Sequence, residues 1–302
     1  MKKLSVLLVG IALLLSGCTT AASTVSDISA ADITLPIVHS GEVPTVKRVV
    51  ALANGSAEIV AALGYEPILV GRDVASTMPS LSTVPIDNPG HNISTETVLA
   101  QKPDLILIDS NTSPSSALVT LKASGIKIIT IPSTFELKTI SEKELAVADA
   151  LGVPRAGELL SQQITSIVQK NEQSEPIKVV FLYLRGSSSI YLIGGKGSGA
   201  DSLITAMGFT DIGAAKLAQP FSAMSAEELI TLNPDVILLM TKGLGSVGGI
   251  TGLVQLPGIA QTSAGKHKRV VTVDDSLLLS FGPRTIPLIP RLRENIVKAS
   301  KL

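Results

Sequence analysis

The chain has 302 residues, and its 25 basic and 25 acidic side chains leave no net charge at neutral pH. This balance gives no support to nucleic-acid binding, and a hydrophobic content of 45% excludes a disordered chain. The length is sufficient for two domains with cores of their own. With five Phe, three Tyr and no Trp, those cores must consist mainly of aliphatic side chains.

The first residues are expected to be a targeting segment. Lys2 and Lys3 precede an apolar stretch, 4–15, that is too short for an ordinary membrane-spanning helix. Leu-Ser-Gly-Cys follows and resembles a bacterial lipobox, in which the cysteine, here Cys18, carries a lipid anchor. We therefore predict a signal peptide at 1–17 and anchoring at the extracytoplasmic face of the cell membrane. The alternative is an ordinary signal peptide beside a chance cysteine.

Behind this segment, the sequence predicts a tether and two lobes. Residues 18–46 are rich in Ser, Thr and Ala, and we expect a flexible tether there. Strand and helix patterns then alternate over 47–136, which indicates an α/β lobe with a mostly parallel sheet. Residues 137–174 have apolar side chains at helical spacing and predict a long linking helix. Because Gly152 and Pro154 interrupt the stretch, a kinked helix or a long helix preceded by a short one is the alternative. A second lobe follows at 175–302.

One sequence pattern occurs in both lobes. It runs from Ser94 through Lys-Pro-Asp to an apolar strand, and again from Ser225 through Asn-Pro-Asp to another. Each copy predicts a capped helix of two turns, a tight turn and a buried strand. The repetition indicates two similar Rossmann-like lobes with a ligand cleft between them.

These features resemble the helix-linked class of periplasmic binding proteins. The resemblance rests on the lipobox, the repeated Pro-Asp strand, the linking helix and the run Asn-Gly-Ser-Ala-Glu-Ile at 54–59, followed by Ala-Leu-Gly at 62–64. It covers 47–302 and implies a substrate-binding lipoprotein of an ABC importer. Importers of this class carry haem, ferric siderophores or cobalamin.

Two candidate iron ligands come from different lobes. His91 lies in a loop at a strand end, where open α/β sheets bind ligands, and a neutral imidazole is a good iron ligand. Tyr183 and Arg185 lie two residues apart in an expected strand and therefore share a face. A tyrosinate suits ferric iron, and a nearby guanidinium favours the ionised phenol. The alternatives are a solvated loop histidine and a half-buried strand tyrosine.

A glycine-rich turn is a third candidate site. Lys196, Gly197 and Ser198 precede an expected helix from about Asp201, and free amides at a helix start attract carboxylates such as haem propionates. Tyr191, just upstream, could pack on a flat ligand. A simple hairpin turn followed by a helix cap explains the same residues.

The candidates are similar to those of haem-binding members of the class. One branch places a tyrosine shortly after a Gly-x-Asp segment, present here at 71–73, but Met78 occupies the expected tyrosine position. An actinobacterial branch uses a first-lobe histidine and a second-lobe tyrosine, with an arginine two residues later. His91, Tyr183 and Arg185 match that branch. The resemblance implies haem held between His91 and Tyr183, with Met78 as a pocket wall or substitute ligand. A ferric-siderophore or cobalamin carrier is the alternative.

The repeat also supplies a candidate docking surface. Glu96 and Glu227 occupy equivalent positions in its two copies. The resemblance implies that one acidic residue on each lobe docks on arginines of the two permease subunits, whereas an imperfect capping box is the structural alternative. Nucleophile-elbow and zinc-protease motifs are missing. We therefore expect a non-catalytic protein that delivers haem to an ABC permease dimer and its ATPase.

Overall fold

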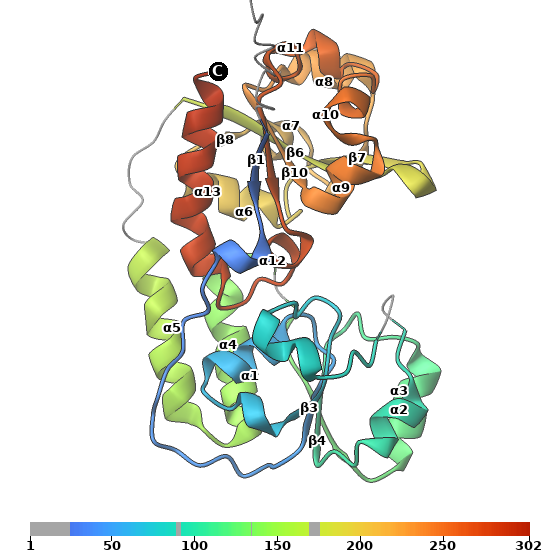
Figure 1. Ribbon diagram of the computed structural model, residues 1–302, viewed down its shortest axis with the longest axis vertical. Coiled ribbons are helices and arrows are strands. Elements are labelled where there is room, and N and C mark those ends of the chain that lie inside the picture. Colours follow the sequence, from blue (N-terminus) through green and yellow to red (C-terminus); the bar gives the residue numbers. More distant parts are fainter. Residues whose placement is uncertain (1–24, 89–91, 134, 169–175) are drawn as a thin grey trace, which may run out of the picture.

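The computed structural model describes residues 25–88, 92–133, 135–168 and 176–302. Its two α/β lobes lie one above the other along the long axis of the molecule (Figure 1). This arrangement confirms the predicted fold class. Among the described residues, no helix is both long enough and apolar enough to cross a membrane.

The N-terminal lobe contains a parallel four-stranded sheet in the order β3-β2-β4-β5. All four residues of β4 are buried, which explains its uninterrupted apolar sequence, since parallel strands are covered on both faces. The elements are β2 (Val49–Ala51), α1 (Ser56–Ala62), β3 (Leu69–Arg72), α2 (Thr95–Ala100), β4 (Leu105–Ile108), α3 (Ser115–Ala123) and β5 (Lys127–Thr130).

The C-terminal lobe contains a larger sheet in the order β1-β11-β10-β6-β7-β9, with β8 beside β6. Strands β7 and β9 are antiparallel to their neighbours, and the other pairings are parallel. The strands are β1 (Val25–Ile28), β6 (Lys178–Arg185), β7 (Ile190–Gly194), β8 (Thr210–Asp211), β9 (Phe221–Ala223), β10 (Val236–Met240) and β11 (Val270–Val273). The helices are α6 (Ala200–Ala206), α7 (Ile212–Lys216), α8 (Ala226–Leu232), α9 (Thr241–Ser246), α10 (Gly249–Leu253), α11 (Ser263–His267), α12 (Asp275–Leu279) and α13 (Thr285–Ser300).

The repeated pattern forms equivalent structures in the two lobes. Ser94 caps α2 by accepting the backbone N–H of Thr97, and Ser225 caps α8 by accepting that of Glu228. Each helix leads into a buried central strand, β4 or β10. The local capping signal was therefore sufficient to predict both helix starts.

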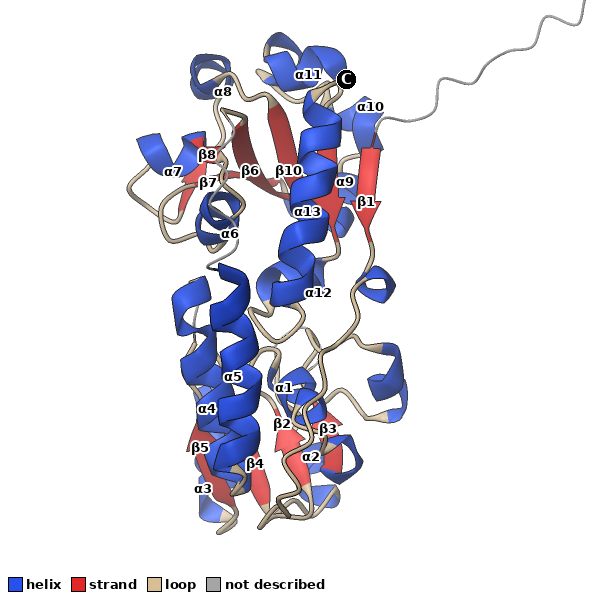
Figure 2. Ribbon diagram, turned by 90° about the vertical axis from the view of Figure 1, so that its left-hand side faces the viewer, coloured by secondary structure: helices blue, strands red, loops and turns tan. Residues whose placement is uncertain are grey.

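Two helices, α4 (Ile140–Leu151) and α5 (Pro154–Val168), form the linking segment, so the interruption at Gly152 and Pro154 divides it into two helices. Gly152, with φ of +78°, ends α4, and Pro154 begins α5, a position where its missing N–H costs nothing. The helices lie side by side (Figure 2). Helix α4 contributes Val147 and Leu151 to the core of the N-terminal lobe, so this lobe extends beyond the expected boundary at residue 136.

The segment expected to be a flexible tether is largely part of the fold. Strand β1 pairs in parallel with β11, and Ile33 belongs to the core of the C-terminal lobe. The chain then descends to the other lobe (blue in Figure 1), where Val38 and Val46 are buried in the core. The backbone N–H of Val38 donates to the carbonyl of Ala62 at 2.8 Å. Residues 25–46 thus connect both lobes, a correction to the tether prediction.

Candidate functional site

A cavity of about 570 Å³ lies between the lobes, within the usual size of small-molecule sites. Five of the residues that line it lie at or just after the carboxyl ends of strands, namely Leu52, Asp109, Arg185, Lys242 and Asp275. Ligands of open parallel sheets bind at this edge. Because both lobes point this edge at the cavity, a ligand there would touch both.

Most charges in the cavity wall are compensated by other protein groups. Asp109 accepts the backbone N–H of Asn54 at 2.9 Å, that of Asn111 at 3.0 Å and the Thr112 hydroxyl at 2.9 Å. Asp275 accepts from the Arg185 guanidinium at 3.0 Å, and its second oxygen accepts the backbone N–H of Lys242 at 3.1 Å. Asp275 is thus the partner of Arg185, which the sequence did not identify.

Tyr183 and Arg185 share one face of β6, as predicted. The Arg185 guanidinium lies 4.7 Å from the centre of the Tyr183 ring, and the Phe221 ring packs against the same tyrosine with centroids 5.7 Å apart. Among the described residues, none forms a hydrogen bond with the Tyr183 hydroxyl. Arg185 lines the cavity itself, so Tyr183 lies one side chain behind the cavity wall.

His91 and Cys18 lie outside the described residues. Along the chain, the described residues closest to position 91 that line the cavity are Asn88 and Ile93. Asn88 is 7% exposed and accepts the backbone N–H of Val74 at 2.8 Å, and Ile93 donates to the carbonyl of Ser113 at 3.1 Å. The chain is therefore fixed at the cavity wall on both sides of 89–91.

The glycine-rich turn does not offer free amides to an anion. Asp201, in the first turn of α6, accepts the backbone N–H groups of Gly197 at 2.8 Å and Gly199 at 3.0 Å. The N–H groups of Lys196 and Ser198 donate to backbone carbonyls at 3.0 and 3.1 Å. A carboxylate of the protein therefore already accepts two of these amides, as the hairpin-and-cap alternative requires, and an anion site at Lys196, Gly197 and Ser198 stays a prediction.

Tyr191 and Met78, two further predicted contacts, are not among the residues that line the cavity. Tyr191 pairs with Leu184 across β6 and β7, so it lies on the opposite sheet face from Tyr183 and packs on a different core. Met78 packs against the core of the N-terminal lobe. The alternation of side chains along β6 and β7 places only one of the two tyrosines on the face of Arg185.

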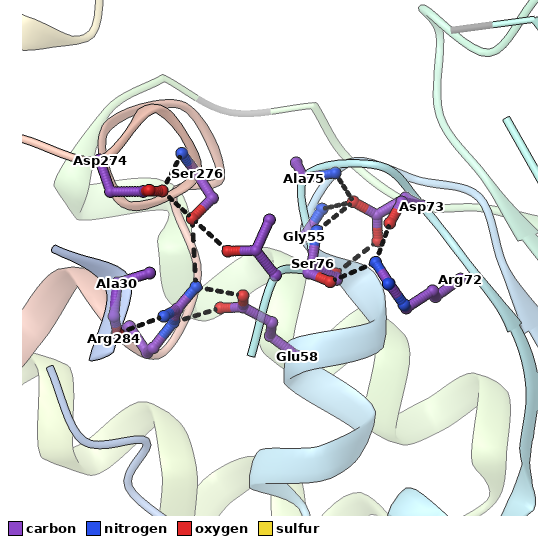
Figure 3. Close-up of polar contacts among 11 residues, drawn as sticks. Ala30, Gly55, Glu58, Arg72, Asp73, Ala75, Ser76, Asp274, Ser276 and Arg284 are labelled. Atoms are coloured by element: carbon purple, nitrogen blue, oxygen red, sulfur yellow. Dashed lines mark hydrogen bonds and ion pairs between the residues drawn. The ribbon is translucent and has the colours of Figure 1, made fainter. Parts of the chain in front are cut away.

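Beside the cavity, buried polar contacts join the lobes (Figure 3). Arg284, 1% exposed, donates from two nitrogens to the carboxylate of Glu58, 0% exposed, and at 3.0 Å to the carbonyl of Ala30. The Thr77 and Ser276 hydroxyls, which come from opposite lobes, are 2.7 Å apart. These contacts fix how the two cavity walls face each other.

A buried lysine makes a second polar connection between the lobes. The Lys143 ammonium donates to the carbonyl of Asn54 in one lobe and, at 2.8 Å, to that of Ser280 in the other. Burial lowers the pKa of Lys143 to about 8. The lysine and the Glu58–Arg284 pair were not singled out as structural by the sequence, because each joins residues far apart in the chain.

Exposed aromatic rings near the cavity were also missed by sequence reasoning. Phe135 lines the cavity and is 41% exposed, and Phe221, against Tyr183, is 38% exposed. Exposed phenyl rings beside a cavity can pack on a flat aromatic ligand. Nothing in the local sequence distinguishes these two phenylalanines from the buried Phe181.

Comparison with known proteins identifies the family. A model of the periplasmic binding protein family matches residues 49–277, and the chain belongs to this family. Its curated relative YvrC of Bacillus subtilis, an uncharacterized ABC transporter substrate-binding lipoprotein, is 26% identical over 259 residues. That match covers 83% of this chain and 80% of YvrC.

The structure is similar to those of several haem-binding proteins. The periplasmic haem-binding protein RhuT from Roseiflexus is 32% identical, with a TM-score of 0.79 over 84% of this chain and 99% of RhuT. The haem-binding protein HmuT is 29% identical, with a TM-score of 0.79 over 90% of this chain and 96% of HmuT. BhuT, solved with two haems, is 29% identical, with a TM-score of 0.75 over 84% of this chain and 99% of BhuT.

Proposed function

We propose that this protein captures haem outside the cytoplasm and delivers it to an ABC importer. The observation that carries the proposal is Tyr183, which lies one side chain behind the cavity wall near the end of β6. Among the described residues its hydroxyl has no hydrogen-bond partner, and Arg185 and Phe221 pack against its ring. Structural similarity to RhuT, HmuT and BhuT supports haem as the ligand. Alanine variants of HmuT were solved at a histidine, a tyrosine and an arginine, and this arginine follows the tyrosine by two positions.

In the proposed complex, Tyr183 and His91 ligate the iron from the two lobes. Tyr183 would supply its oxyanion, and the Arg185–Asp275 pair would hold the phenol ring in place. Asn88 and Ile93, both at the cavity wall, support the assignment of His91. Phe135 and Phe221 would pack on the macrocycle. Because one ligand comes from each lobe, haem binding and closure of the lobes would be one event.

The importer partnership is part of the same proposal. Glu96 and Glu227 are exposed, and each is the second residue of a helix capped by the repeated serine. One such residue on each lobe suits a partner made of two permease subunits. The lipoprotein relative YvrC supports anchoring through Cys18, which would keep the protein beside its permease.

An optical titration with haemin tests the proposal. The protein used for the titration should begin at residue 24, so that it keeps β1. The wild type is expected to shift the Soret band at one haem per protein, and Tyr183→Phe and His91→Ala should each change that spectrum. Tyr191→Phe serves as the matched control, because it removes the same hydroxyl from the opposite face of the sheet. Its spectrum should equal that of the wild type.

Each contrary outcome has a defined meaning. A wild type without a Soret shift overturns the haem proposal and leaves a ferric siderophore or cobalamin as the cargo to test. A shift that Tyr183→Phe leaves unchanged overturns the ligand assignment alone. Thermal unfolding of the variants without haem shows whether any loss comes from misfolding.

A further inference from the structure

The cavity wall contains one charged side chain that no described residue compensates. Asp109 has three donors, and the charges of Arg185 and Asp275 meet at 3.0 Å. The remaining charged side chain of the wall is Lys242. Among the described residues, no hydrogen bond or ion pair reaches its ammonium group.

The backbone around Lys242 is held firmly at the cavity. Its N–H donates to Asp275 at 3.1 Å, and the preceding Thr241 hydroxyl donates to Asp27 of β1 at 2.7 Å. Asp275 also holds Arg185, so the lysine backbone and the guanidinium over Tyr183 share one carboxylate. The exposed side chain of Lys242 therefore starts from a fixed point beside the proposed iron ligand.

A bound anion would find no other free cation in the described wall. The glycine-rich turn that the sequence suggested for carboxylates is occupied by Asp201. The Arg185 guanidinium is already paired with Asp275. A carboxylate inside the cavity would instead gain most from Lys242, because a free ammonium loses no existing partner when it forms the pair.

We propose that Lys242 forms the ion pair with a carboxylate of the transported ligand and so selects porphyrins that carry free acid side chains. The proposal rests on the haem function proposed above. It assigns charge recognition to the loop after β10, whereas iron recognition lies at β6. The two interactions together would orient the macrocycle between the lobes.

A cycle of two ligands and two proteins tests this pairing. Haemin, which has free propionates, and haemin dimethyl ester, which has none, are titrated into the wild type and Lys242→Gln in the same buffer. Lys242→Gln is expected to bind haemin about tenfold more weakly, as for loss of a charge-assisted hydrogen bond, and to bind the ester as the wild type does. Lys122→Gln, an exposed lysine on α3, is the charge-matched control and should change neither affinity.

The outcomes separate this inference from the function on which it rests. A wild type that binds neither ligand overturns the haem function and this inference with it. If the wild type and Lys242→Gln bind haemin with equal affinity, the inference alone is overturned. An equal loss for haemin and its ester also overturns it, because the lysine would then act on the protein rather than on the carboxylate.

Discussion

Removing the charge of Glu58 should strongly destabilise the protein. In Glu58→Gln the side-chain volume is kept, but Arg284, at 1% exposure, is left with an uncompensated buried charge. Its remaining acceptors are the neutral carbonyl of Ala30 and the Ser276 hydroxyl, at 3.0 and 3.4 Å. Breaking one partner of such a pair costs about 3–5 kcal/mol. For a chain of this size we expect Tm to fall by about 6–20 °C.

Thermal and guanidinium unfolding of the chain from residue 24, followed by circular dichroism, measures this loss. Glu294→Gln is the control, because Glu294 pairs with Arg291 at 3.3 Å on the surface, where ion pairs contribute little. Its Tm should match that of the wild type. The double variant Glu58→Leu/Arg284→Met should be more stable than Glu58→Leu alone or Arg284→Met alone, because no charge is left buried without its partner.

One result would refute this reasoning. If Glu58→Gln unfolds within 1 °C of the wild type, the pair does not couple the lobes as its burial implies. The argument would also be contradicted if the double variant lost more free energy of unfolding than the two single variants lose together. Mutual charge compensation would then not be the reason why Glu58 and Arg284 stabilise the fold.

Three further predictions follow from the packing. Asp87→Asn should raise Tm at pH 7.5. Asp87 accepts from the Gln101 amide at 2.9 Å, but its second oxygen and the Gln101 side-chain oxygen have no donor among the described residues. The amide of an asparagine at position 87 would donate to that Gln101 oxygen. Burial raises the pKa of Asp87 to about 6, so the folded state holds this proton more tightly than the unfolded state does. The wild type should therefore lose stability relative to the variant as pH rises from 4 to 6. Equal pH dependence of Tm for the two proteins would contradict this. Gly55→Ala should lower Tm more than Gly41→Ala, since both have positive φ, but a Cβ at Gly55 would lie 2.9 Å from the Ser280 Cβ, whereas Gly41 faces open space; equal losses would argue against the close contact. A chain that begins at residue 46 should unfold at a lower temperature than one that begins at residue 24, because it lacks β1 and exposes an edge of β11; equal Tm values would show that residues 25–45 contribute nothing.

Features that depend on neighbours in the chain could be predicted from the sequence. The period of two along β6 placed Tyr183 and Arg185 on one face, and the structure has their side chains 4.7 Å apart. The serine caps of α2 and α8 followed from the same local logic. The carboxylate in the glycine-rich turn was also local, since Asp201 lies within four residues of Gly197, and the alternative of a hairpin turn followed by a helix cap describes it.

The two-lobed α/β order follows from local sequence patterns, because alternating strands and helices and the repeated caps are encoded over a few residues. Contacts between residues far apart in the chain became visible only in the folded structure. Thr272 bonds to Asp27 across 245 positions, and Arg284 reaches Glu58 across 226, and no local pattern records such pairs. The composition of 18–46 resembles a tether, yet 25–46 is folded because β11 presents an open edge and both cores accept its few apolar side chains. Burial in a shared interior creates these contacts, and burial is a property of the whole fold.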